Sequence, residues 1–400
     1  MALRGRERRR LTDVGRILAA QGLRAVAYGF GAVLLGVVLE GRGWSGTEVG
    51  ALLAALVAGT ALTSVLVAAY GERLGRRRFY GLLYLGLALA GAAFAATGNF
   101  AVLAAVALTG TLSTEVVESG PFTSLEQAML AESTESEARS RVFGTYNAVA
   151  TLAGAGGALL AGAPRTLGPH WFAVFVPIAL LGAVLARSLS PAVEAPPLDA
   201  EALGRSRFGL SRSGPVVARL SGLFAVDSLG GGFVVQAFIA YWLRRRFGAS
   251  PGTLGAIFAA IGLLQAVSFL MAGRLVARFG LLNTMVFTHL PSNLLLAAVP
   301  AAPTLPVAAV LLFARSALSQ MDVPTRQAYV MALVDPGERT AAAAWTNSVR
   351  YAVRPLGPVL GGALTQVALG APFVVAGTIK SAYDLALWRW FRRVPLAPEG

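Results

Sequence analysis

The 400-residue sequence contains no cysteine and only two histidines. Without cysteine it can build neither a disulfide framework nor a thiolate metal site, and two histidines are too few for a metal site made of imidazoles. A phosphate-binding loop of the Gly-x-x-x-x-Gly-Lys-Ser type is also missing, so direct use of ATP is not expected. We therefore expect no metal and no other cofactor.

Charged residues are scarce as well, at 14% of the sequence, whereas apolar residues make up 56%. Soluble domains carry about 25% charged residues, so a soluble globule is excluded. Windows of roughly 20 apolar residues, enough to cross about 30 Å of hydrocarbon, recur along nearly the whole chain. They predict an all-α membrane protein with twelve transmembrane helices. The expected spans are residues 13–40, 46–71, 79–97, 101–130, 139–162, 171–189, 216–244, 251–277, 281–301, 305–333, 339–367 and 371–391.

The two halves of the chain repeat each other. Residues 50–55 return as 255–260 at an offset of 205 residues, and the tripeptide at 126–128 returns at 326–328, at an offset of 200. Such a duplication predicts two pseudo-symmetric six-helix bundles. The stretch between them is rich in proline and charge and cannot span a membrane. The expected organisation is an N-terminal half at 1–189, a cytoplasmic linker at 190–215 and a C-terminal half at 216–400.

The net charge of +14 indicates the orientation of the chain. Most of the 34 Lys and Arg residues fall in the tails and in alternate loops on one side, so both termini should be cytoplasmic, in an inner (cytoplasmic) membrane. Met1–Arg10 lacks the cleavage site of a signal peptide, and we interpret it as a cytoplasmic tail. Arg244–Arg246 contradict the rule: either their helix continues outward with arginines at the headgroups, or the topology is wrong there. We expect the basic loops to bind anionic lipid headgroups and not nucleic acid.

The turn between the second and third spans carries a recognisable pattern. Residues 68–77 read Ala-Ala-Tyr-Gly-Glu-Arg-Leu-Gly-Arg-Arg, with a weaker copy at Gly273–Gly280. This turn resembles the signature loop of the major facilitator superfamily, which is Gly, three residues, Asp, Arg, one residue, Gly and two basic residues. The resemblance covers essentially the whole chain and implies the major facilitator fold, with alternating access to a mid-membrane site. It also implies that Glu72 sits against helix ends of the opposite half and holds the cytoplasmic side closed. Arg73, Arg76 and Arg77 are further gating candidates, and anchoring to lipid headgroups is an equal and compatible interpretation of Arg76 and Arg77.

Some family patterns are altered here. Ala68 replaces the first glycine of the loop, Glu72 replaces its aspartate, and Ala277 stands where the second copy would have an acid. The Gly-Pro-x-x-Gly-Gly string of drug antiporters, usual in the fifth span, occurs in the eleventh span at 357–362, and the fourth span lacks their arginine. These differences weaken an exporter assignment without removing it. The many glycines of the fifth and eleventh spans predict close helix packing.

By the resemblance, spans one, four, seven and ten line a central cavity, and each carries ionisable residues near its midpoint. An ionised side chain there costs about 2.5 to 3.5 kcal/mol, which requires a water-filled cavity or mutual pairing. Glu115 and Glu118 are three apart, which on one helix face would bring them within about 5 to 6 Å, so one should hold a proton near neutral pH. The alternatives are ion pairing with arginines or contact with a cationic substrate. The proton-coupling candidates are Glu115, Glu118, Asp227 and Asp322.

The arginines of the spans have two interpretations. Arg350 and Arg354 lie one turn apart in span eleven, and with Arg24 they could hold an anionic substrate or neutralise the acids. Asn147 and Asn347 are matched by the duplication and could contact substrate or neighbouring helices. The candidate substrate contacts are Arg24, Asn147, Gln236, Asn347, Arg350 and Arg354.

Other polar and proline positions suggest gating. Glu126 and Arg326 occupy equivalent positions of the two halves, and we expect them to form an ion pair between the halves as an inner gate. Pro121 and Pro324 predict kinks in spans four and ten. Lys380 and Asp384, four apart in span twelve, should pair with each other on a peripheral helix without a transport role.

Together these features predict a monomeric secondary transporter that moves a small organic molecule by alternating access, as proton-coupled efflux. The first alternative is a transporter of anions held by the cavity arginines. A membrane-embedded lipid enzyme is a less favoured alternative, since neither His170 nor His289 comes with a motif that assigns it a catalytic partner. A sensor or scaffold should carry an added soluble domain, and the loops here are short.

Overall fold

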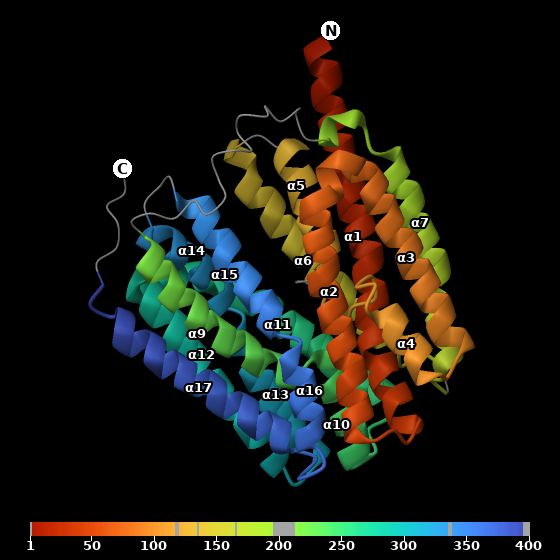
Figure 1. Ribbon diagram of the computed structural model, residues 1–400, viewed down its shortest axis with the longest axis vertical. Helices are drawn as coiled ribbons and strands as arrows, with labels where there is room; N and C mark the ends of the chain where they lie inside the picture. The colour runs from red at the N-terminus through yellow and green to blue at the C-terminus, as the bar shows by residue number, and fades with distance from the viewer. Residues whose placement is uncertain are drawn as a thin grey trace. The chain divides into compact units, whose positions relative to one another are not determined.

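The computed structural model describes residues 2–116, 120–133, 136–164, 166–194, 213–334 and 338–394 (Figure 1). Within these ranges, the structure describes the backbone alone at 2–11, 68, 72, 131–132, 136–141, 339–341 and 344. Every regular element in the described part is helical. Seven of its helical segments are long and apolar enough to cross a membrane by length and composition. The fold is the twelve-span, all-helical one that the sequence predicts.

The first six spans run as follows. They comprise α1 (Ala2–Gly41), α2 (Gly46–Leu74), α3 (Arg76–Ala96), α4 (Phe100–Ala107) with α5 (Pro121–Ser133), α6 (Ser136–Leu160), and η1 (Pro169–Val174) with α7 (Phe175–Ser188), followed by the short η2 (Pro191–Val193). The last six comprise α9 (Gly214–Phe233) with α10 (Gln236–Phe247), α11 (Pro251–Phe279), α12 (Leu281–Ala298) with η3 (Val299–Ala301), α13 (Leu305–Ser319) with α14 (Asp322–Leu333), α15 (Arg339–Val353) with α16 (Leu356–Leu364), and α17 (Ala371–Phe391).

The chain packs as two compact units whose limits differ from the two sequence halves. Unit 1 contains Met1–Trp44, Ala55–Pro197 and Gln236–Gly262. Unit 2 contains Ser45–Ala54, Leu198–Val235 and Leu263–Gly400. The stretch at 236–262 therefore packs with the first six spans, and most of the expected linker, at 195–212, lies outside the described residues.

Spans four, seven, ten and eleven are interrupted. Span four breaks between α4 and α5, where Gly110 and Gly120 adopt the left-handed backbone (φ 67° and 60°) and Pro121 starts the next helix. Such positions suit glycine and proline, because glycine tolerates positive φ and proline needs no hydrogen-bonded N–H in a first turn. Pro324 likewise lies in the first turn of α14. The predicted proline kinks are thus wrong, because each proline follows a break in its span.

Close backbone approach at glycines holds the helices of each unit together. In unit 1, a side chain at Gly157 of α6 would collide with the backbone of Val26 in α1. In unit 2, Gly357 of α16 faces the backbone of Gly232 in α9 in the same way. Small residues permit such contacts in lipid. The packing role predicted for the glycines of spans five and eleven is confirmed at both positions.

Candidate functional site

Unit 1 contains a buried ion pair between its first and fourth spans. Arg24 Nη2 of α1 lies 2.6 Å from Glu126 Oε2 of α5, and both side chains are 0% exposed. The guanidinium also lies over the ring of Phe122, 4.8 Å from its centroid. A charge-assisted bond this short, with an aromatic face beside it, can hold both charges away from water.

Tyrosine hydroxyls complete the shell around Glu126. Tyr80 of α3 donates to Oε1 and Tyr146 of α6 donates to Oε2, each at 2.6 Å. Tyr84, one turn after Tyr80, donates to the Ala20 carbonyl at 2.8 Å. We call this cluster the Glu126 network, and its described residues are Arg24, Tyr80, Tyr84, Glu126 and Tyr146. Among them are one acid and one base.

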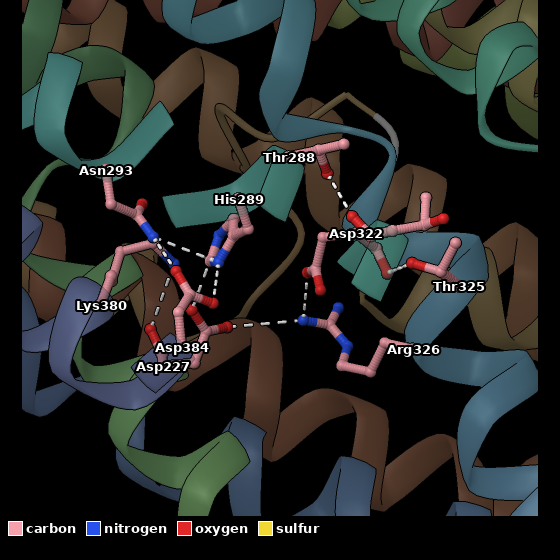
Figure 2. A network of polar contacts seen from close by, with 10 residues as sticks. Asp227, Thr288, His289, Asn293, Asp322, Thr325, Arg326, Lys380 and Asp384 are labelled. Carbon is pink, nitrogen blue, oxygen red and sulfur yellow. Dashed lines mark hydrogen bonds and ion pairs between the residues drawn. The ribbon is translucent and has the colours of Figure 1, made fainter. Parts of the chain in front are cut away.

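Unit 2 contains a larger network around Asp227 (Figure 2). Asp227 of α9 contacts Lys380 Nζ of α17 through Oδ1, and its Oδ2 lies 3.4 Å from Arg326 Nη1 of α14. The same arginine nitrogen lies 2.8 Å from Asp322 Oδ2. The side chains of these four residues are at most 9% exposed.

A second part of this network centres on His289 of α12. Its Nδ1 lies 2.9 Å from Asp384 Oδ1, and its Nε2 lies 3.9 Å from Asp227 Oδ1. Asn293, one turn along α12, donates to Asp384 Oδ2 at 2.8 Å. The seven residues Asp227, His289, Asn293, Asp322, Arg326, Lys380 and Asp384 form what we call the Asp227 network (Figure 2).

A pocket in unit 2 adjoins this network. It encloses about 470 Å³, within the usual range for small-molecule sites. The polar side chains on its wall are Arg326, Gln327, Thr346, Asn347 and Arg350, and Phe224 and Met331 supply apolar surface. Arg326 therefore belongs both to the pocket and to the Asp227 network.

The inner-gate pair between Glu126 and Arg326 stays a prediction, and each of the two residues has ionic partners inside its own unit. Glu126 bonds to Arg24, and Arg326 bonds to Asp227 and Asp322. Glu126 and Arg326 are buried, and their short contacts to acids and bases of their own unit account for that burial. The sequence showed the matched positions but could not show which side chains reach them.

Of the predicted carboxylate pair in span four, Glu115 alone belongs to the described residues. Glu115 lies in the non-helical stretch between α4 and α5, where its backbone N–H donates to Ser113 Oγ at 3.0 Å. The argument from helical spacing therefore does not apply, and Glu118 lies outside the described residues. Asp227 and Asp322, the other two proton-coupling candidates, come together in the Asp227 network.

The candidate substrate contacts are dispersed. Arg24 is fully buried in its ion pair, whereas Asn347 and Arg350 of α15 line the pocket. Asn147 is half-buried in α6, and its carbonyl accepts from Thr151 Oγ1 at 2.8 Å. Gln236 and Arg354 are half-buried at breaks in spans seven and eleven, Gln236 as the first residue of α10 and Arg354 directly after α15.

The signature turn is tied to the end of the first half. The Glu194 carboxylate accepts from the backbone N–H groups of Arg76 (2.6 Å) and Arg77 (3.3 Å) at the start of α3. A carboxylate is favoured at a helix N-terminus by about 0.3 to 1 kcal/mol. Arg73 is exposed, and the side chain of Glu72 lies outside the described residues. Glu194 therefore occupies a helix-end position for which the family resemblance suggested no residue.

The exceptional arginines of the seventh span are explained in part. α10 extends to Phe247, so the helix does continue past residue 244. Arg244 Nε lies 2.9 Å from Glu40 Oε2, and its Nη1 donates to the Ala249 carbonyl at 3.2 Å. Arg245 and Arg246 are exposed. One of the three charges is therefore neutralised within unit 1.

Sequence reasoning missed several residues of both networks. Lys380 and Asp384 were expected to pair with each other, but Lys380 binds Asp227 and Asp384 binds His289 and Asn293. At the repeat offset of 205 residues, His289 corresponds in sequence to Tyr84 of unit 1. Comparing the halves position by position could have singled out His289, because polar groups recur there on corresponding helices. The residues missed are Tyr80, Tyr84, Tyr146, His289, Asn293, Lys380 and Asp384.

Comparisons with known proteins agree with this architecture. The family profile of the Major Facilitator Superfamily matches residues 17–243 and 220–400. A Saccharomyces cerevisiae protein described as an uncharacterized membrane protein is 26% identical and covers 94% of this chain and 93% of its own length.

Two solved structures illustrate the fold. A bacterial homologue of the human lysosomal transporter Spinster has a TM-score of 0.75 at 15% identity, covering 98% of this chain and 99% of its own. The nucleoside transporter NupG has a TM-score of 0.71 at 13% identity, covering 96% and 98%. At these identities the two structures support the fold alone.

Proposed function

The chain belongs to the Major Facilitator Superfamily, and from that premise we propose that it couples protons to the export of a small organic molecule across the cytoplasmic membrane. Membership makes it a multi-pass membrane transporter and not an enzyme. The coupling ion, the direction, the membrane and the cytoplasmic placement of both termini belong to the proposal.

One observation supports the coupling: Arg326 belongs both to the pocket and to the Asp227 network. Arg326 lines the pocket, and its Nη1 also lies 2.8 Å from Asp322 and 3.4 Å from Asp227. A solute that draws this guanidinium toward itself weakens its bonds to the two carboxylates. Carboxylates with weaker cationic partners bind protons more readily. Solute and proton occupancy are therefore linked through a single side chain.

The linkage is reciprocal by thermodynamic necessity. If solute binding changes the proton affinity of the network, protonation must change the solute affinity by the same factor. Secondary transporters use such coupling to move one species against its gradient at the expense of another. Export requires that the externally facing state bind protons and release solute.

The test is transport in proteoliposomes with an imposed pH gradient and a panel of cationic, neutral and anionic compounds. We expect at least one compound to accumulate only when the lumen is more acidic than the outside and the protein is inserted inside-out. Arg326→Gln should abolish gradient-driven accumulation, because it separates pocket from network. Arg219→Gln removes an exposed arginine of α9 and serves as the matched control. Equal transport with and without the gradient for every compound transported would refute proton coupling.

A second candidate concerns the substrate: an organic anion. The pocket wall carries two arginines, Arg326 and Arg350, and two side-chain amides, Gln327 and Asn347, and none of the described residues that line it is acidic. Guanidinium groups offer forked donors that match carboxylate or phosphate. This lining fits an anion better than a cation.

Arg350 separates the two substrate classes. Arg350→Gln should weaken transport of anionic compounds about 10- to 100-fold, as expected for losing one hydrogen bond to a charged group, and should change neutral compounds little. Arg350→Lys retains the charge without the fork and should have an intermediate effect. Cationic compounds that inhibit uptake better than anionic ones would exclude an anion as substrate.

A further inference from the structure

The Asp227 network contains more acids than permanent cations. Its carboxylates are Asp227, Asp322 and Asp384, whereas its permanent cations are Arg326 and Lys380. All five side chains are at most 9% exposed. A buried carboxylate without a compensating charge is costly, and such groups bind a proton instead. One more positive charge is required for neutrality.

The contacts show where the missing charge belongs. Lys380 and Arg326 bind Asp227, and Arg326 also binds Asp322. Asp384 instead contacts His289 and the neutral amide of Asn293. Asp384 is therefore the carboxylate served by no permanent cation within this network.

His289 lies where a proton would be most useful. Its Nδ1 faces Asp384 at 2.9 Å, and its Nε2 faces Asp227 at 3.9 Å. With a hydrogen on Nδ1 alone, the bare Nε2 lone pair would point toward a carboxylate. Protonation of Nε2 turns that repulsion into attraction and supplies the missing charge, because imidazolium donates from both nitrogens.

The elements packed around α12 carry the other charged groups of this region. α9 contributes Asp227, α14 contributes Asp322 and Arg326, and α17 contributes Lys380 and Asp384. Tyr383 of α17 adds a neutral ring whose centroid is 6.1 Å from that of His289. α13 also packs on α12, and its one ionisable residue is Arg315.

Unit 1 provides an internal comparison. Among the described residues of the Glu126 network, one acid meets one base. The position matching His289 at an offset of 205 is Tyr84, whose hydroxyl donates to a backbone carbonyl. The duplicated halves therefore differ at this position in their capacity to take up a proton near neutral pH.

Unpartnered polar atoms point to an occupant of the same region. Asp322 Oδ1, Asn293 Oδ1 and the Tyr383 hydroxyl are buried and have no hydrogen-bond partner among the described residues. Three such atoms beside one network are costly to leave unpaired.

We propose that the Asp227 network binds one exchangeable proton on His289, held between Asp384 and Asp227. Bound, the proton makes the network neutral. Released, it leaves Asp384 as an uncompensated buried carboxylate and favours a rearrangement of Lys380 and Arg326. This site deepens the proposed proton coupling and rests on it only for its role in transport.

The direct test observes the His289 imidazole itself and therefore needs no substrate. The chain has two histidines, so replacing the other one leaves a single imidazole signal. His170 is exposed in unit 1, so His170→Asn leaves a single histidine, His289, for isotope-edited NMR of the purified protein. We expect one protonation step of that imidazole between pH 5 and pH 9. An imidazole that keeps one protonation state across this range would overturn the proposal.

Two further variants should move the step in opposite directions. Asp384→Asn restores the balance of acids and cations without a proton, so His289 should protonate at a pH lower by more than about one unit. Lys380→Gln deepens the deficit, so the step should rise by a similar amount. A merely structural role for the two residues predicts shifts of the same sign or none, and either result contradicts the proposal.

Transport then separates this inference from the proposed function. In proteoliposomes, His289→Gln should retain exchange of labelled for unlabelled compound at equal pH but lose gradient-driven accumulation. If the unaltered protein shows no gradient dependence while the NMR step is present, the proton site stands and the coupling fails. If gradient dependence survives in His289→Gln, the role of this site in transport is wrong and the coupling stands.

Discussion

Arg24 and Glu126 illustrate how a single buried pair constrains this protein. Both side chains are fully buried and 2.6 Å apart. Removing one partner breaks a buried ion pair, which typically costs about 3 to 5 kcal/mol. We predict that Glu126→Leu loses free energy of unfolding in this range, measured by equilibrium unfolding in detergent. The tyrosine hydroxyls of Tyr80 and Tyr146 lose their acceptor as well, which adds to the loss.

The double variant provides the control. Arg24→Met combined with Glu126→Leu removes both charges and fills the space with apolar atoms, and such replacements are often neutral or stabilising. It should be more stable than Glu126→Leu alone. A double variant less stable than either single variant would show that the pair contributes net stability, contrary to this account.

Individual residues were predicted from the sequence as far as their need for partners. Ionisable side chains in apolar spans must pair or face water, which marked Arg24, Asp227 and Asp322. The partners themselves depend on side-chain reach in three dimensions. Lys380 and Asp384 are four apart on one helix and could bind each other. Instead, each contacts a residue of a neighbouring helix, Asp227 for Lys380 and His289 for Asp384. Local spacing therefore selected the wrong pair.

At the scale of elements, α1 and α6 pack through glycines, and two neighbouring glycines on α6 differ in what faces them. A side chain at Gly157 would meet the backbone of Val26, whereas one at Gly156 would meet nothing within 4 Å. We predict that Gly157→Ala lowers the melting temperature measured in detergent, because α1 and α6 must separate. Gly156→Ala is the matched control and should be neutral or stabilising by up to about 1 kcal/mol, since alanine favours helix. Equal effects would contradict packing as the reason for the glycine.

The course of the spans was predictable and their interruptions were not. Apolar windows located the membrane crossings, because length and hydropathy act over some 20 residues. A break depends on a few backbone angles, and the same Pro121 is compatible with a kink or with the first turn of a new helix. In the structure the positive φ of Gly120 selects the break. That choice placed Glu115 off the helix, so the argument from helical spacing no longer applies to it.

At the scale of the whole molecule, the duplication preserves positions but reverses charge. In unit 1 the first span supplies the cation, Arg24, and the fourth supplies the anion, Glu126. In unit 2 the seventh span supplies the anion, Asp227, and the tenth supplies the cation, Arg326. An ion pair of either polarity compensates the buried charges that the two helices carry. Because unit 2 has its acid on the seventh span, Lys380 and His289 can contact that acid. In unit 1 the first span carries a cation, which does not favour basic neighbours.

The absence of cysteine makes the orientation of the chain directly testable. Arg73 and Arg278 are exposed at turns expected on the cytoplasmic side, and Gly98 and Ala301 are exposed at turns expected on the other side. We predict that single cysteines at Gly98 and Ala301 react with a membrane-impermeant maleimide in intact cells, whereas those at Arg73 and Arg278 react only after permeabilisation. The opposite pattern would reverse the topology. It would also mean that Arg245 and Arg246 face the cytoplasm, where exposed arginines are expected, so the labelling decides whether they obey the positive-inside rule.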